Sequence, residues 1–244
     1  MSRVIGFDRP LRLDWLDAAA GVSKDTSDIV QIRNYLHTYL AESYPHYTAR
    51  RKTITVLTRV WSRIPESDRS HRERAFALLP TLNQTDRIWL HWGMCLLAYP
   101  FFRDVMRTVG NSLRYYGNFS NPEIIQRMNE VWGERSTMSK AIPRVIESLN
   151  NWGVIARCEQ KGRYRCAAPL STSNKDVQLW LLRATLCANP NDSFPVDQIH
   201  TIPEVFPFSC SLSIPDILGS HEFEVSQMGN NRLALRCSER KRAD

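Results

Sequence analysis

One stretch of the sequence, residues 120–153, carries start and stop signals for two successive helices and constrains the fold more than any other part. Ser120-Asn121-Pro122-Glu123 matches a capping box with proline in the first turn. Gly133 can take the left-handed conformation that ends a helix. Ser136 or Thr137 can begin the next helix, which Trp152-Gly153 closes. The sequence therefore predicts two consecutive helices here.

The second of these helices is strongly amphipathic. Its apolar residues recur at helical spacing and predict a buried face that contains Met138, Ile142, Val145, Ile146 and Leu149. The outer face would carry Ser136, Thr137, Ser139, Lys140, Arg144, Glu147 and Asn151. Pro143 costs roughly 3 kcal/mol inside a helix, so we expect the helix to start later or to kink there.

A short basic hairpin is predicted directly after this helix. Its strands would cover residues 154–158 and 164–168, around the turn Gln160-Lys161-Gly162-Arg163, with Arg165 beside it. Together with a helix over 101–116, these elements are typical of a winged helix-turn-helix, which we expect over residues 99–169. Such a module lays its third helix in a nucleic-acid groove. The alternatives are a solvated helix face and an ordinary solvated hairpin.

The fold class expected for the whole chain is mainly α. Apolar residues at helical spacing predict helices over about 25–42, 48–63, 67–79 and 85–98, which should pack as an N-terminal bundle within residues 1–98. Residues 1–25 are ambiguous between a short helix and an arm. The helix over 48–63 is strongly basic and contains Arg50, Arg51 and Lys52.

The C-terminal third is expected to be a small α+β region over residues 175–237. After a linker over 169–174, the pattern predicts a buried helix over 176–187, a short helix near 214–218, and a hairpin of strands 222–228 and 232–237 around Gly229-Asn230-Asn231. This order of elements is compatible with a second, winged-helix-like unit.

The charge and cysteine content favour an anionic partner and a reducing compartment. The net charge is +7 and the pI is near 9.3, as in many nucleic-acid-binding proteins. The six cysteines form no C-x-x-C pair, and the N-terminus lacks a secretory apolar region. We therefore expect a cytoplasmic protein with reduced cysteines. The most apolar window, 88–102, is too short to cross a bilayer, so we expect no membrane partner.

Motifs that would indicate catalysis are missing from the sequence. Neither of the glycine-rich phosphate-binding motifs occurs, and the six histidines show no zinc-ligand spacing with cysteine. Glu159-Gln160-Lys161 matches a fragment of metal-dependent nucleases, but it falls on the predicted hairpin without the second acid that a magnesium ion needs. We therefore expect no enzyme activity, no cofactor and no metal.

Several short motifs resemble the BrxA family of BREX phage-defence systems over about residues 28–170. They are Thr48-Ala49-Arg50-Arg51, the segment Leu96-Leu97-Ala98-Tyr99-Pro100-Phe101-Phe102-Arg103-Asp104, the segment Trp132-Gly133-Glu134-Arg135-Ser136-Thr137, and Trp152-Gly153-Val154-Ile155. The resemblance implies sequence-tolerant DNA binding within a multi-protein prokaryotic defence system, with other defence proteins as partners.

We therefore expect a non-enzymatic protein that binds double-stranded DNA. The expected contacts are Arg135, Ser136, Thr137, Ser139, Lys140 and Arg144 on the third helix, Lys161, Arg163 and Arg165 on the hairpin, and Arg50, Arg51 and Lys52 as a second contact. Two other hypotheses stay open. The chain could be a protein-docking adaptor that uses its winged helix, or a sequence-specific transcriptional regulator, which would need a dimer to match two half-sites.

Overall fold

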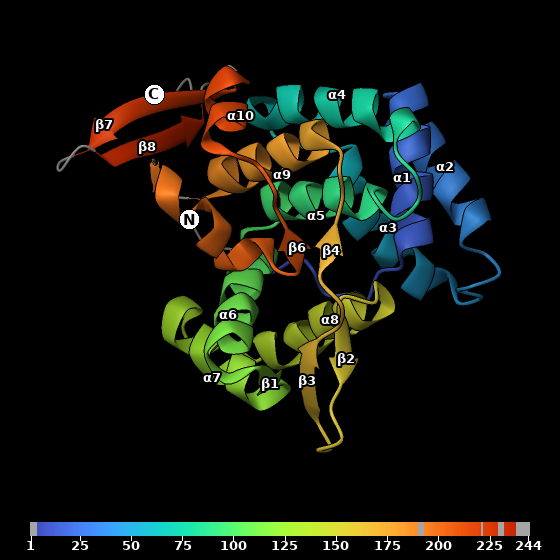
Figure 1. Cartoon of the computed structure of the whole chain (residues 1–244). Helices are drawn as coiled ribbons and strands as arrows, with labels where there is room; N and C mark the ends of the chain where they lie inside the picture. Colours follow the sequence, from blue (N-terminus) through green and yellow to red (C-terminus); the bar gives the residue numbers. More distant parts are fainter. Residues whose placement is uncertain (1–3, 190–192, 221, 229–231, 238–244) are drawn as a thin grey trace.

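The structure is a computed structural model, and it describes residues 4–189, 193–220, 222–228 and 232–237 (Figure 1). Helices dominate it, as the sequence predicted. The N-terminal helices are α1 (Leu13–Asp25), α2 (Ile29–Tyr39), α3 (Tyr47–Trp61), α4 (Arg69–Leu78) and α5 (Arg87–Ala98). The ambiguous first segment is thus irregular over residues 4–12 and helical from Leu13. Asp28 caps α2 by accepting from the N–H of Val30 at 2.8 Å.

The middle of the chain contains the elements that the sequence predicted and one that it did not. They are α6 (Pro100–Tyr116), β1 (Asn118–Ser120), α7 (Asn121–Trp132), α8 (Met138–Asn151), β2 (Ile155–Arg157) and β3 (Arg163–Cys166). The three strands form an antiparallel sheet in the order β1-β3-β2. The unpredicted strand β1 follows Gly117, whose φ of 73° turns the chain out of α6. A three-residue strand is too short to show an alternating pattern.

The C-terminal part builds a second sheet with the same strand order. It contains β4 (Leu170–Ser171), α9 (Lys175–Ala188), β5 (Phe194–Pro195), β6 (Phe208–Ser209), α10 (Ile214–Gly219), β7 (Phe223–Met228) and β8 (Arg232–Cys237), with 3₁₀ turns η3 (Val196–Thr201) and η4 (Pro203–Val205). The order is β5-β8-β7, and β4 pairs with β6 in parallel. The predicted short helix and both hairpin strands are confirmed. The predicted turns at 189–192 and 229–231 lie wholly or largely outside the described residues.

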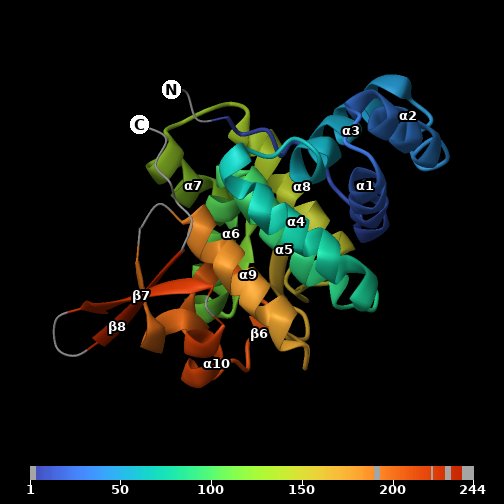
Figure 2. The same cartoon turned by 90° about the horizontal axis from the view of Figure 1, so that it is seen from above.

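One hydrophobic core runs through all three predicted segments. The larger cluster of buried side chains includes residues from α1 to α8 and the inner face of α9. Helices α5 and α9 are buried along almost their whole length and lie side by side (Figure 1 and Figure 2). Gly93 packs against the ring of Trp180. Figure 1 shows α4, α9 and α5 stacked on one side of the molecule, with α6, α7 and α8 on the other. A smaller cluster lies between α9 and the β5-β8-β7 sheet.

The cysteine prediction is wrong at one pair. Cys187, at the end of α9, and Cys237, at the end of β8, form a disulfide with a Cα–Cα distance of 5.6 Å. No sequence pattern indicates this disulfide, because the two cysteines are 50 residues apart and only the fold brings them together. Cys95, Cys158, Cys166 and Cys210 are free thiols.

Among the described helices, none combines the length and the apolar character that crossing a bilayer requires.

Candidate nucleic-acid interface

The outer face of α8 is exposed where the sequence placed it. All five predicted apolar positions are buried, and Ser136, Thr137, Ser139, Lys140, Arg144, Glu147 and Asn151 are exposed. Helix α8 begins at Met138, with Thr137 as its N-cap residue, and it continues through Pro143. Because Pro143 is only the sixth residue of α8, it removes one hydrogen bond near the helix start, where few neighbouring turns depend on it.

The protein's own N-terminal segment, residues 4–12, covers a second side of α8. The N–H of Leu11 donates to Ser148 Oγ at 2.9 Å, and Trp152 Nε1 donates to the Leu11 carbonyl at 3.1 Å. Phe7 is fully buried against Tyr99 and Phe102. The Leu11 contacts fix the segment beside α8, and the Phe7 contacts fix it to the start of α6. The predicted outer face of α8 stays exposed.

Two hollows flank this N-terminal segment, and Asp8 lines both of them. The first, of about 480 Å³, is lined by Lys52 and Thr55 of α3 together with Arg135 and Thr137, which lie directly before α8 and not on the helix as predicted. The second, also of about 480 Å³, is lined by Arg9, Ser139, Lys140, Pro143 and Arg144 in addition to Asp8. Five basic side chains and one acidic side chain therefore line two hollows that share Asp8, and this surface draws on three segments distant in sequence.

We call this surface the arm–α8 surface. Its basic members are Arg9, Lys52, Arg135, Lys140 and Arg144. Arg135 also lies over the ring of Trp132, with its guanidinium carbon 5.9 Å from the ring centroid. Arg144 pairs with Glu147 at 2.9 Å, and both side chains are about half exposed, so the charge of Arg144 stays open to a stronger anionic partner.

Helix α3 contributes fewer basic side chains to the arm–α8 surface than the sequence predicted. Arg50 donates through Nε to His37 Nδ1 at 3.3 Å and through Nη1 to the carbonyl of Tyr44 at 2.9 Å. It therefore holds the loop between α2 and α3, and the prediction of Arg50 as a contact residue is not supported by its position. Arg51 and Lys52 are exposed, and Lys52 reaches the first hollow.

The predicted contact residues of the β2–β3 hairpin lie in two different environments. Lys161 is exposed in the turn, and Arg165 is exposed on β3. Arg163 closes the predicted turn, because its N–H donates to the Gln160 carbonyl at 3.2 Å, and it is also the first residue of β3. Its side chain donates to Asn118 Oδ1 at 2.6 Å and pairs with Glu123 at 3.0 Å, so it is held within the fold and does not project from the turn as predicted. Neither hollow includes a hairpin residue, and Figure 1 shows the hairpin projecting away from the body of the molecule.

Arg163 instead completes the start of α7. The carboxylate of Glu123 accepts the N–H of Ser120 at 2.8 Å in the predicted capping box. Partial burial raises the pKa of Glu123, but the Ser120 N–H and the Arg163 guanidinium outweigh it and lower the pKa overall. This arrangement ties β3 to the first turn of α7.

The N-terminal segment was the part of the site that the sequence left open. Arg9 could have been noticed because it stands among apolar residues at positions 5, 7 and 11, which the structure buries. Nothing in the sequence indicated that these side chains would pack beside α8 rather than within an N-terminal bundle.

Comparison of the chain with protein-family models, with curated proteins and with solved structures finds no match.

Proposed function

We propose that this chain is a non-enzymatic protein that binds double-stranded DNA through the arm–α8 surface. The observation that carries the proposal is the gathering of five basic side chains around one acid, on two hollows that join α3, α8 and the N-terminal segment. Phosphate neutralisation by lysine and arginine supplies most of the affinity in sequence-independent DNA binding. Exposed hydroxyls at Thr137 and Ser139 add donors for phosphate oxygens.

The order of elements in the middle of the chain supports a winged helix-turn-helix as the DNA-binding unit. Helix α6, strand β1, helices α7 and α8, and the hairpin β2–β3 follow one another, and β1 pairs with β3. In that fold α8 takes the place of the helix that enters the major groove, and the hairpin takes the place of the wing. Lys161 and Arg165 on the hairpin would then contact backbone phosphates beside the groove.

The make-up of the arm–α8 surface favours sequence tolerance. Its basic side chains are spread over α3, the N-terminal segment and α8 rather than along α8 alone. Phosphate contacts position a protein on DNA without reading sequence. We therefore propose a protein that tolerates many sequences rather than a sequence-specific regulator.

The proposed cellular setting is a prokaryotic phage-defence assembly in the cytoplasm, and it depends on the sequence resemblance alone. A disulfide such as Cys187–Cys237 is uncommon in a reducing compartment unless it is labile or regulatory. That cysteine pair therefore needs its own explanation, which is given in the next subsection.

A docking adaptor is the second candidate, and one observation favours it. Tyr35 and Tyr39 on α2 are 48% and 42% exposed and stack on each other at 6.1 Å. Exposed aromatic side chains are typical of protein interfaces. If this face carries the function, reversing charge on the arm–α8 surface would leave the function intact.

DNA-binding titrations at two salt concentrations distinguish these candidates. With five phosphates neutralised, the affinity for unrelated duplexes should fall by about 500-fold between about 50 and 200 mM salt. Lys140→Glu combined with Arg144→Glu should weaken binding at least tenfold and reduce the salt slope by about 2. The matched control is Arg232→Glu combined with Arg236→Glu, which changes the net charge equally on exposed residues of β8.

The control pair should bind nearly as tightly as the unchanged chain. A flat salt dependence, or equal losses for the two pairs, would contradict the proposal. Equal losses would mean that net charge alone, and not the arm–α8 surface, attracts the duplex.

A further inference from the structure

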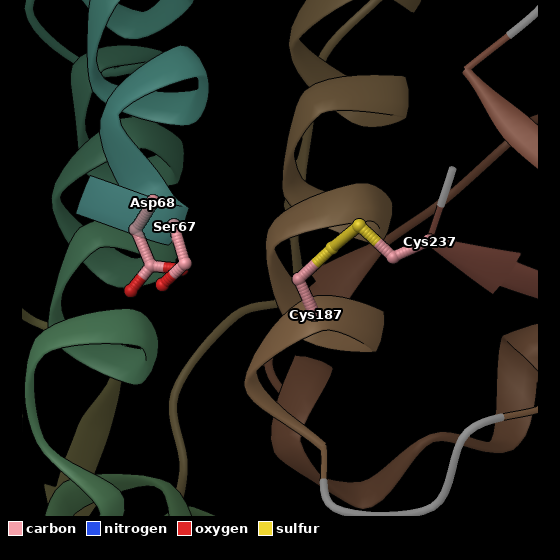
Figure 3. The surroundings of a disulfide bond; sticks show 4 residues. All are labelled: Ser67, Asp68, Cys187 and Cys237. Atoms are coloured by element: carbon pink, nitrogen blue, oxygen red, sulfur yellow. A yellow bond between two sulfur atoms is a disulfide. The ribbon is translucent and has the colours of Figure 1, made fainter. Parts of the chain in front are cut away.

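Three side chains of types that bind metal ions lie close together in a part of the fold that shares no residue with the arm–α8 surface. They are His71 in α4, Cys187 in α9 and Cys237 in β8, and their ligand atoms all lie within 4.8 Å of one another. His71 and Cys187 are buried, and Cys237 is half-buried. Figure 3 shows the two cysteines joined as the disulfide, with Ser67 and Asp68 on the facing helical segment.

The spacing of these side chains suits zinc as well as a disulfide. Zinc binds thiolate at about 2.3 Å and imidazole at about 2.0 Å in a tetrahedron, which separates neighbouring ligand atoms by about 3.5 to 3.8 Å. The ligand atoms of His71, Cys187 and Cys237 lie within 4.8 Å of one another, a limit only slightly larger than this tetrahedral separation. A Cα–Cα distance of 5.6 Å leaves two reduced cysteines close enough to share one ion after rotation about their Cα–Cβ bonds.

A small hollow gives an ion a way in and leaves one coordination position open. Its volume is about 160 Å³, and its lining includes Asp68, His71, Arg103, Cys187 and Cys237. A water molecule from this hollow, held by Asp68, can complete a tetrahedral set of two sulfurs and one nitrogen.

Arg103 places a cation beside the cysteine pair. Its guanidinium donates to the carbonyl of Ala188, the residue after Cys187, and it is held in place by an ion pair with Asp104 at 2.9 Å, which balances part of its charge. A nearby cation favours thiolates over thiols. Zinc with two thiolates and a neutral imidazole carries no net charge, so Arg103 does not oppose the loaded site.

We propose that His71, Cys187 and Cys237 form a zinc site in the reduced protein, and that the Cys187–Cys237 disulfide is the oxidised, metal-free state of the same site. In the reducing step, two small thiols pass two electrons and two protons to the disulfide and become a disulfide themselves. Zinc binding then releases the two cysteine protons. The two states exclude each other because a sulfur in the disulfide is no longer a thiolate ligand.

This proposal explains how a disulfide cysteine pair fits a reducing compartment, and it does not depend on DNA binding. The sequence concealed the site because its ligands come from three elements, with 115 residues between His71 and Cys187. Sequence patterns reveal zinc sites when the ligands are close together in the chain.

The test uses the full chain, reduced with a phosphine so that no added thiol competes for metal, then loaded with zinc and desalted. Elemental analysis should find about one zinc per chain, and cobalt in its place should show the absorption of a tetrahedral thiolate complex. Zinc should also protect Cys187 and Cys237 from alkylation in the unchanged chain. That readout needs no variant and so does not depend on how a variant folds.

Variants assign the ligands. His71→Ala should lose zinc in the reduced state while still forming the disulfide when oxidised, and His71→Cys should keep zinc because cysteine can replace histidine as a ligand. Cys187→Ser should lose both zinc and the disulfide. The matched control, Cys166→Ser, removes a half-buried free thiol and should change neither.

Two results would overturn the proposal. One is a reduced, unchanged chain that holds no more zinc than Cys187→Ser and leaves both cysteines open to alkylation, which would make the pair a structural disulfide only. The other is a His71→Ala chain that binds zinc as well as the unchanged chain does.

Discussion

The two sheet-containing units of the molecule share a topology but differ in what they expose. Residues 100–166 and residues 175–237 each form a three-stranded sheet in which the first strand pairs with the last. Before the hairpin, the first unit has the fourteen-residue α8, whereas the second has the six-residue α10. Six residues make fewer than two helical turns, too few to offer a continuous outer face. Strand order alone therefore does not indicate a binding surface.

The units also differ in how they use their first helix. Helix α6 has a buried face and an exposed face, whereas α9 is buried from Val177 to Ala188. The second unit is thereby fixed to the N-terminal helices, and η4 lies against α6. Arg107 of α6 pairs with the buried Glu204 of η4, and Trp92 Nε1 donates to the Glu204 carbonyl at 2.8 Å. In this comparison the second unit supports the first.

The largest expected effect comes from separating the units. A Cβ atom at Gly110 would stand 2.0 Å from the carbonyl oxygen of Pro203, which is backbone and cannot turn aside. Gly110→Ala should therefore push η4 away from α6 and lower the free energy of unfolding by about 3 kcal/mol, at the upper end of overpacking costs. Urea unfolding followed by tryptophan fluorescence measures this change.

Gly21→Ala is the matched control for that substitution. Gly21 lies inside α1 with nothing within 4 Å of an added Cβ, so alanine there should raise the free energy of unfolding by about 0.5 to 1 kcal/mol through its helix propensity. Similar changes for the two substitutions would mean that α6 and η4 are not held together as described.

A smaller effect tests the division of roles on the hairpin. Arg163→Ala removes the pairing with Glu123 and Asn118, and it should lower the free energy of unfolding by about 1 to 2 kcal/mol. Lys161→Ala, at the exposed turn, should leave unfolding within about 0.5 kcal/mol of the unchanged chain and weaken only the binding of DNA.

The same urea titrations, with DNA binding measured at one salt concentration, check both substitutions. If Lys161→Ala destabilises the fold as much as Arg163→Ala does, the hairpin turn is packed rather than free. If neither substitution weakens DNA binding, the hairpin is not part of the interface and α8 must act with the N-terminal segment alone.

Local signals made most of the helical architecture predictable. The capping box at Ser120 and the stop at Gly133 set the limits of α7, and the spacing from Met138 to Leu149 gave the buried face of α8. Such signals depend on neighbours within one or two turns, so a single sequence contains them. The C-terminal hairpin was predictable for the same reason.

Contacts between distant segments were not predictable. Strand β1 exists because Phe119 pairs with Tyr164. Arg163, which the sequence predicted as a phosphate contact, instead holds the fold together because Glu123 lies beside it. The covering of α8 through Leu11 is likewise a contact across more than 130 residues. A helical pattern therefore predicts which residues face outward, but not which distant segment packs beside the helix.

The smallest expected effect compares the two capping boxes as the pH falls. In the second unit the carboxylate of Asp216 accepts from Lys175 Nζ at 2.6 Å and from the Ser213 N–H at 2.9 Å, much as Glu123 accepts from Arg163 and Ser120. Lys175 and Ser213 lower the pKa of Asp216, and the pKa of Glu123 is lowered as well. Both groups stabilise the fold while they are ionised.

The sign of the pH effect follows from these directions. A carboxyl whose pKa is lower in the folded state contributes stability above its unfolded pKa, near 4, and loses it as the pH falls through the folded value. Glu123→Gln should therefore flatten the loss of stability between about pH 5 and pH 2. The flattening should be only a few tenths of a kcal/mol, because the side chain of Glu123 is 41% exposed and solvent screens its ion pair.

Asp216→Asn completes the comparison. It should flatten the loss of stability at acid pH in the same direction as Glu123→Gln does. Urea titrations at several acid pH values measure both substitutions. Because α7 leads into α8 but α10 leads only into β7, acid should weaken DNA binding through Glu123 and not through Asp216. An equal effect of both substitutions on DNA binding would show that the second unit shapes the interface and does more than support it.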